Sequence, residues 1–211
     1  MPVAIDALFV TRLYRASLAE ERDYVAFMAE LEDACRGIAE EDVAGRAWSK
    51  AHGYRGYTSY ASLTDLPTRA SVFGQLKRRL DRHAAVFTEA LQFDLGGRRV
   101  RLDSLWINVL RPGGAHSGHI HPHSVLSGTL YVVVPPGAGA IQFEDPRLPQ
   151  MMAAPPRRAD APEDARAFVR REPQPGDVLI WESWLRHEVE RHAGTAKGGE
   201  RVSLSFNYAW G

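Results

Sequence analysis

Apolar residues recur at intervals of three and four in two long segments of the first hundred residues. The first segment runs from Tyr24 to Ile38 and the second from Phe73 to Leu91. Such intervals place the apolar side chains on one face of a helix. Gly96 and Gly97 follow the second segment and are expected to stop it. The pattern therefore predicts two amphipathic helices, each burying one face.

The region around these helices carries weaker signals. Residues 3–16 hold closely spaced apolar side chains and predict an opening strand that ends near Ser17. Ser17-Leu-Ala-Glu20 matches a capping box, so the first helix is expected to start there. Residues 48–64 mix glycine, serine and tyrosine without a clear period and are expected to form a loop with short extended pieces.

From residue 98 onward the chain consists of short β-type segments separated by turns rich in glycine and proline, such as R-P-G-G and P-Q-P-G-D. The predicted strands are residues 99–110, 127–134, 140–143, 167–171, 177–181 and 202–210. Many short strands of this kind are typical of a sandwich or barrel in which two sheets share a core. Residues 146–166, rich in proline, alanine and charge, form no evident element and predict a long loop, either functional or disordered.

We therefore expect one domain, residues 1–211, that is mostly β with flanking helices. Its N-terminal helical region, residues 1–97, is expected to pack on the outer face of one sheet of the β core formed by residues 98–211.

Composition narrows the classes of function. The 26 basic and 26 acidic residues give a net charge of zero, so no overall field favours nucleic acid or an anionic membrane. No uncharged stretch approaches the roughly 20 residues that span a bilayer. The single cysteine, Cys35, lies in the first helical stripe and suits a reducing compartment. These features favour a cytoplasmic protein that acts on a small molecule, a protein or a peptide.

Three alternate histidines, His119, His121 and His123, stand in the stretch G-H-I-H-P-H. In an extended strand, residues two apart face the same side, so His119 and His121 are expected to present two imidazoles to one metal ion. Two imidazoles alone hold a divalent cation weakly and leave its geometry undefined. His187, which follows a predicted strand, is the best candidate for a third ligand.

The last predicted strand places Arg201, Ser203 and Ser205 on one face and apolar residues on the other. An arginine with a hydroxyl two residues further along suits a carboxylate, because the guanidinium group can bind both carboxylate oxygens.

The combination of H-x-H, a distal histidine and R-x-S resembles the iron(II)- and 2-oxoglutarate-dependent dioxygenases of the double-stranded β-helix, or jelly-roll, fold. More closely, the string H-x-H-P-x-S-x-L-S-G resembles a bacterial family of 2-oxoglutarate/iron(II) oxygenases. The similarity covers residues from about 105 to 210.

This resemblance implies an oxidoreductase that uses iron(II) and 2-oxoglutarate, forms succinate and hydroxylates a substrate that the sequence does not identify. It implies that His119, His121 and His187 hold the metal and that Arg201 binds the far carboxylate of 2-oxoglutarate with the help of Ser203. Further candidate cosubstrate groups are Tyr131 and Asn108. No catalytic residue is expected beyond the metal ligands.

One departure from the common pattern leaves the ligand set open. The usual facial triad has two histidines and one carboxylate, whereas here a third histidine stands at the carboxylate position. We expect three histidine ligands, with two alternatives: a set that includes His123, or a set completed by Glu144 or Asp145.

Two other functions compete with the oxygenase. One is a cupin-type three-histidine metalloenzyme that does not use 2-oxoglutarate, and the other is a jelly-roll protein that binds a metal or ligand without turnover. The oligomeric state is left open, with a homodimer as one expectation.

Overall fold

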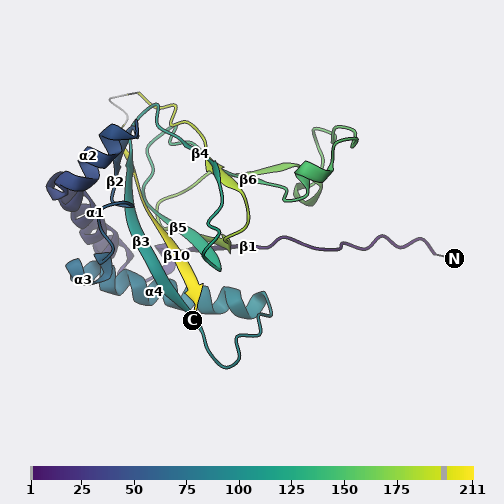
Figure 1. Ribbon diagram of the computed structural model, residues 1–211, viewed down its shortest axis with the longest axis horizontal. Helices are drawn as coiled ribbons and strands as arrows, with labels where there is room; N and C mark the ends of the chain where they lie inside the picture. The colour runs from purple at the N-terminus through teal and green to yellow at the C-terminus, as the bar shows by residue number, and fades with distance from the viewer. Residues whose placement is uncertain (1, 196–198) are drawn as a thin grey trace.

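Two antiparallel β-sheets and a layer of helices form the body of the protein (Figure 1). The structure is a computed structural model, and it describes residues 2–195 and 199–211. The larger sheet has the strand order β1-β8-β5-β10-β3-β2 and the smaller sheet the order β4-β9-β6-β7. The strands of the larger sheet are, in that order, Leu13–Ser17, Asp177–Glu182, Leu126–Val133, Arg201–Trp210, Val100–Leu110 and Gly56–Thr58; those of the smaller sheet are His116–His119, His187–Val189, Ile141–Glu144 and Phe168–Arg171. This arrangement is the predicted jelly roll.

Helices lie against the larger sheet, as predicted. The two long amphipathic helices are confirmed as α1 (Tyr24–Glu41) and α4 (Ser71–Ala90), joined by α2 (Val43–Ala51) and the short α3 (Leu66–Arg69). Leu31 of α1 and Leu76 of α4 are fully buried in one cluster with side chains of the sheet. No helix among the described residues is both long enough and apolar enough to cross a membrane.

The central strand β10 separates two environments. Its residues Val202, Leu204, Phe206 and Tyr208 belong to the main apolar cluster beneath the helices. The alternate residues Arg201, Ser203 and Ser205 line a cavity that is also bordered by residues of the smaller sheet. Because successive side chains of a strand point to opposite faces, one ten-residue segment supplies both apolar core and polar site.

The N-terminal strand is shorter than predicted. Only β1 pairs, with β8, while residues 2–12 leave the body as an extended arm (Figure 1). The side chains of Ile5 and Phe9 are 94% and 91% exposed. A strand requires a partner for its backbone groups, and the arm has no paired strand among the described residues, so the predicted start at residue 3 is wrong.

Two other local predictions need correction. Ser17 caps the single-turn 3₁₀ helix η1 (Leu18–Glu20), accepting a hydrogen bond from the Ala19 amide at 3.3 Å, and α1 begins only at Tyr24. The predicted loop over residues 48–64 begins later than expected because α2 continues to Ala51. Strand β2 is the short extended piece expected within it.

The long segment predicted over residues 146–166 contains only the one-turn 3₁₀ helices η2 (Leu148–Gln150) and η3 (Glu163–Ala165). It projects from the body on the side of β6 (Figure 1).

Candidate metal centre and cosubstrate pocket

Three histidines from different parts of the chain converge between the two sheets. His119 ends β4, His187 begins β9 directly opposite it in the antiparallel register, and His121 follows two residues after β4. One ring nitrogen from each lies within 4.8 Å of the other two. The predicted strand therefore ends at His119 rather than continuing through His121, yet both imidazoles reach the same point as His187.

The outer ring nitrogens are held by hydrogen-bond partners on the protein. Nδ1 of His119 lies 2.7 Å from the carbonyl oxygen of Ser117, and Nδ1 of His187 lies 2.9 Å from that of Leu185. A carbonyl oxygen can only accept, so both Nδ1 atoms carry the proton and both Nε2 atoms keep a free lone pair. This tautomer is the one that can bind a metal ion through Nε2.

The environment keeps two of these imidazoles, those of His121 and His187, neutral. Burial lowers the pKa of His187 to about 3, although its hydrogen bond to the Leu185 carbonyl acts in the opposite sense. Burial and the neighbouring His119 lower the pKa of His121 to about 4. Neutral imidazole is the ligating form, so at neutral pH neither His121 nor His187 has to lose a proton before a metal binds.

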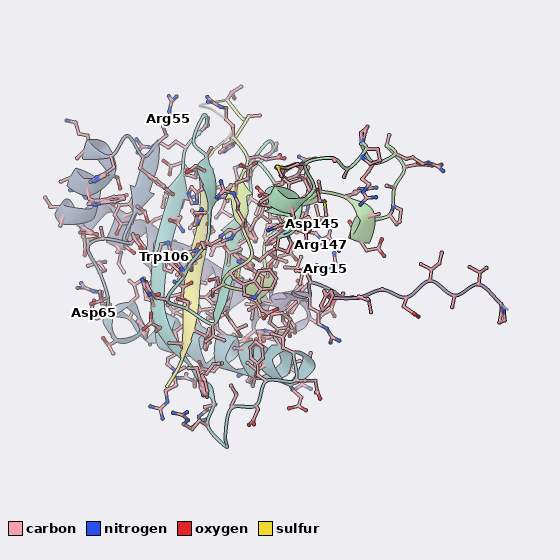
Figure 2. The ribbon with its side chains drawn as sticks, turned by 45° about the vertical axis from the view of Figure 1, so that its right-hand side comes forward. Arg15, Arg55, Asp65, Trp106, Asp145 and Arg147 are labelled. Carbon is pink, nitrogen blue, oxygen red and sulfur yellow. The ribbon has the colours of Figure 1, made fainter. Side chains whose placement is uncertain are left out.

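The alternative ligands lie elsewhere. Among the described residues the metal-binding cluster contains His119, His121 and His187 and no carboxylate. Glu144 forms an ion pair with Arg186 at 3.2 Å, and Asp145 binds Arg147 at 2.8 Å. Figure 2 shows Asp145 and Arg147 side by side near the base of the projecting loop. His123 is exposed in the turn that follows the cluster.

Arg201 lies in the same cavity as the histidine cluster. Its side chain is 1% exposed, and its one hydrogen bond to the described residues is a long one of 3.5 Å from Nη1 to the carbonyl oxygen of Ala138. Its Nε atom is buried without a partner among the described residues. An unpaired charge in such a place costs free energy, and burial lowers the pKa of this guanidinium. A bound anion would remove that cost.

The other predicted cosubstrate residues line this cavity too. Ser203 and Tyr131 are buried next to Arg201, with the guanidinium carbon 5.8 Å from the centre of the Tyr131 ring. Asn108 already has partners: its Oδ1 accepts from Thr58 at 2.9 Å, and its Nδ2 donates to Ser205 at 3.0 Å. Its side chain is therefore held in place before any ligand binds.

Sequence reasoning missed a second pair of polar side chains in the cavity. The hydroxyl of Tyr54 lies 2.8 Å from Nε2 of His116, and both residues line the cavity. Burial and the nearby Arg201 lower the pKa of His116 to about 3, so it is a neutral partner. From the sequence His116, three residues before His119, is expected to be solvent-exposed or a neighbour of the metal ligands, whereas nothing in the sequence links Tyr54 to the site.

The remaining walls are largely aromatic. The ring centre of Trp106, which is labelled in Figure 2, lies 6.0 Å from that of His121. Tyr60 packs edge-on against Trp106, with the ring centres 5.3 Å apart. On the other side Trp181 packs edge-on against His187 at 4.6 Å. The cavity has a volume of about 410 Å³ and no carboxylate among its lining residues in the described chain.

This donor set fits iron(II) together with an anionic cosubstrate. Three neutral imidazoles supply nitrogen ligands suited to iron, and they leave the 2+ charge of the ion uncompensated. The guanidinium of Arg201 in the same cavity carries another positive charge. It has no ion-pair partner among the described residues. A dicarboxylate that reaches both groups would neutralise both.

Comparison with known proteins agrees with this geometry. The model of the family described as "Putative 2OG-Fe(II) oxygenase" matches residues 104–207, about half of the chain. A search of curated protein sequences found no match to this chain.

Solved structures share the fold. A prolyl-4-hydroxylase from Pseudomonas putida is 18% identical, with a TM-score of 0.61 over 93% of this chain and 92% of its own. The epimerase SnoN, in complex with Fe³⁺, α-ketoglutarate and nogalamycin RO, is 14% identical, with a TM-score of 0.63 over 94% of this chain and 79% of its own. HygX from Streptomyces hygroscopicus, with nickel and 2-oxoglutarate bound, is 14% identical, with a TM-score of 0.59 over 94% and 82%.

At these identities the structural likeness shows the fold, whereas the family match covers the segment that contains both the histidine cluster and Arg201. Through residues 104–207 the chain belongs to the 2OG-Fe(II) oxygenase family, and it is an oxidoreductase whose cofactors are iron(II) and 2-oxoglutarate.

Proposed function

We propose that this protein is a dioxygenase that couples decarboxylation of 2-oxoglutarate to hydroxylation of a second substrate. In the balanced reaction, substrate, dioxygen and 2-oxoglutarate give hydroxylated substrate, succinate and carbon dioxide. The observation that carries the proposal is the buried guanidinium of Arg201, which has no ion-pair partner among the described residues, in one cavity with three imidazoles that can share one metal ion.

In this proposal His119, His121 and His187 hold the iron through their Nε2 atoms. When bound, iron(II) would activate dioxygen, which is the oxidant, and 2-oxoglutarate would supply two electrons through its oxidative decarboxylation. The protein's contribution is to hold the ligand nitrogens in place and to line the cavity with the apolar rings of Trp106 and Trp181.

Arg201 binds the far carboxylate of 2-oxoglutarate as a bidentate partner, and the hydroxyl of Ser203, two residues along the same strand face, assists. Tyr131 borders the same end of the cavity, where burial raises its pKa to about 12 and keeps its hydroxyl protonated as a donor. Asn108 is assigned a supporting role, because Thr58 and Ser205 already occupy its amide.

The absence of a carboxylate from the histidine cluster keeps a cupin-type three-histidine enzyme as a second candidate. The two functions differ at Arg201, which a cupin without 2-oxoglutarate does not need. The family match and the buried, unpaired position of Arg201 favour the oxygenase.

The test combines binding and turnover in purified protein supplied with iron(II), ascorbate and 2-oxoglutarate. Wild type should form succinate slowly even without substrate. Arg201→Ala should lose 2-oxoglutarate binding while keeping its metal, and His119→Ala should lose both. The control is Arg111→Ala, which removes an exposed arginine paired with Glu200 at 2.9 Å outside the cavity. Failure of wild type to bind 2-oxoglutarate would refute the proposal.

A further inference from the structure

A cluster of polar side chains, three of them buried and Ser104 half-buried, lies next to His121. It consists of Ser104, Ser127, Ser183 and Asn207, which come from β3, β5, the turn after β8 and β10. The Oγ atoms of Ser127 and Ser183 are 2.8 Å apart, Oδ1 of Asn207 lies 2.8 Å from Ser127 Oγ, and Nδ2 of Asn207 lies 3.1 Å from Ser104 Oγ. Ser127 and Ser183 are at most 1% exposed, and Asn207 is 6% exposed.

Stability alone does not call for this cluster, because hydrogen-bonded hydroxyl and amide groups in the interior add little net stability over apolar residues of similar shape. Asn207 is also the fourth residue in the inward-facing series of β10, after Arg201, Ser203 and Ser205. Ser127 is the second serine of the motif H-x-H-P-x-S-x-L-S-G that resembles the oxygenase family. Neither residue has a part in the function proposed above.

The cluster touches His121 at two points. The backbone amide of His121 donates to the carbonyl oxygen of Ser183 at 2.9 Å, which fixes the chain. The side-chain amide of Asn207 lies 3.5 Å from Nδ1 of His121, which is long for a hydrogen bond. His121 thus differs from His119 and His187, whose Nδ1 atoms face backbone carbonyl oxygens.

The difference matters because a carbonyl oxygen fixes the tautomer of an imidazole and an amide side chain does not. When the NH₂ of Asn207 faces Nδ1 of His121, Nδ1 is an acceptor and the proton belongs on Nε2, where it blocks a metal. When Oδ1 faces Nδ1, the proton sits on Nδ1 and the Nε2 lone pair is free.

The partners of Asn207 permit both orientations. Ser104 and Ser127 contact it through hydroxyl groups, and a hydroxyl can donate or accept. With Oδ1 turned toward His121, Ser104 donates to Oδ1, Nδ2 donates to Ser127, and Ser127 donates to Ser183. Every hydrogen bond of the cluster is kept, so the amide can turn without leaving a buried polar atom unsatisfied.

We propose that Asn207 is a positioning residue for the metal centre: supported by Ser104 and Ser127, its amide turns Oδ1 toward His121 and holds that imidazole in the tautomer that ligates through Nε2. This inference rests on the metal-binding role of His121 in the proposed function. Asn207 is not among the residues that line the cavity, so it would act only through His121.

The test measures Co(II) affinity, by competition with a chelator, and the ¹⁵N shifts of the His121 ring in metal-free protein. Asn207→Ala should weaken Co(II) binding by about 10-fold to 100-fold, the usual effect of losing a residue that orients a ligand, and should change the His121 tautomer balance. Asn207→Asp offers only acceptor oxygens, so it should bind Co(II) at least as tightly as wild type. Ser127→Ala, a milder change, should give a smaller loss than Asn207→Ala.

The matched control is Ser49→Ala. Ser49 is 1% exposed and accepts a hydrogen bond from the Thr58 amide at 3.1 Å, and its side chain has no hydrogen bond to a histidine among the described residues. It should lower stability without changing Co(II) affinity or the His121 shifts.

The outcomes separate this inference from the proposed function. If folded Asn207→Ala and Ser127→Ala both keep wild-type Co(II) affinity and His121 shifts while His121→Ala loses the metal, the role of Asn207 is overturned and the metal site stands. If His121→Ala binds Co(II) like wild type, the proposed ligand set itself fails and the inference fails with it.

Discussion

Replacing Arg201 with methionine should affect stability and cosubstrate binding in opposite directions. The side chain is 1% exposed, its Nε has no partner among the described residues, and Nη1 has only the 3.5 Å contact with Ala138. Methionine has a similar length and needs no hydrogen bonds. Replacing poorly compensated buried charge with apolar side chains of similar volume commonly stabilises a protein by about 1–4 kcal/mol. In the absence of 2-oxoglutarate, Arg201→Met should therefore be more stable than wild type.

The same change should nearly abolish 2-oxoglutarate binding. Two charge-assisted hydrogen bonds to a carboxylate, at about 1.5 kcal/mol each, together contribute about 3 kcal/mol. Their loss corresponds to a Kd raised roughly 150-fold. With 2-oxoglutarate at 100 times its wild-type Kd, wild type should gain about 2.7 kcal/mol of stability from the ligand, whereas Arg201→Met should gain almost none.

The assay is urea denaturation of both proteins, loaded with the same metal, with and without 2-oxoglutarate. The control is Arg111→Ala, which should respond to the ligand as wild type does. The reasoning is refuted if Arg201→Met is less stable than wild type without ligand and still gains stability when 2-oxoglutarate is added. That result would mean that Arg201 stabilises the fold and does not bind the cosubstrate.

Three further predictions concern the fold, acid stability and the metal. Gly128→Ala should destabilise the protein by about 1–3 kcal/mol, because a Cβ at this position would lie 2.4 Å from the Phe206 ring. The urea midpoint measures this loss, and an unchanged midpoint would contradict the packing of β5 against β10. Burial alone would raise the pKa of Asp42, but hydrogen bonds, led by that from Ser62, lower it overall. The stability that Asp42 contributes should therefore be present above its unfolded pKa and be lost as pH falls through the lower folded value, and denaturation from pH 7 to 2 should show a shallower acid decline for Asp42→Asn. Removing metal with a chelator should lower the Tm of wild type but not of His187→Ala, and equal shifts in both would argue against His187 as a ligand.

Local patterns were sufficient for the elements whose identity depends on neighbouring residues. The stripes in residues 24–38 and 73–91 predicted α1 and α4, because a helix face is defined by intervals within one segment. The arm at residues 2–12 shows where this reasoning ends. Its apolar pattern favours a strand, but a strand exists only where another supplies hydrogen bonds, and the intervals within one segment do not reveal that partner.

The sequence by itself determined the chemistry available to this protein: H-x-H, a distal histidine and R-x-S name the side chains, and the alternation along residues 201–210 assigns Arg201 and Ser203 to one face. Only the tertiary structure decided which of these groups meet. It brought His119 opposite His187, paired Glu144 and Asp145 with arginines elsewhere, and placed Tyr54, His116 and Asn207 around the site. The physical reason is that alternation is a local property of one strand, whereas the register between β4 and β9 depends on how two sheets close around a shared interior.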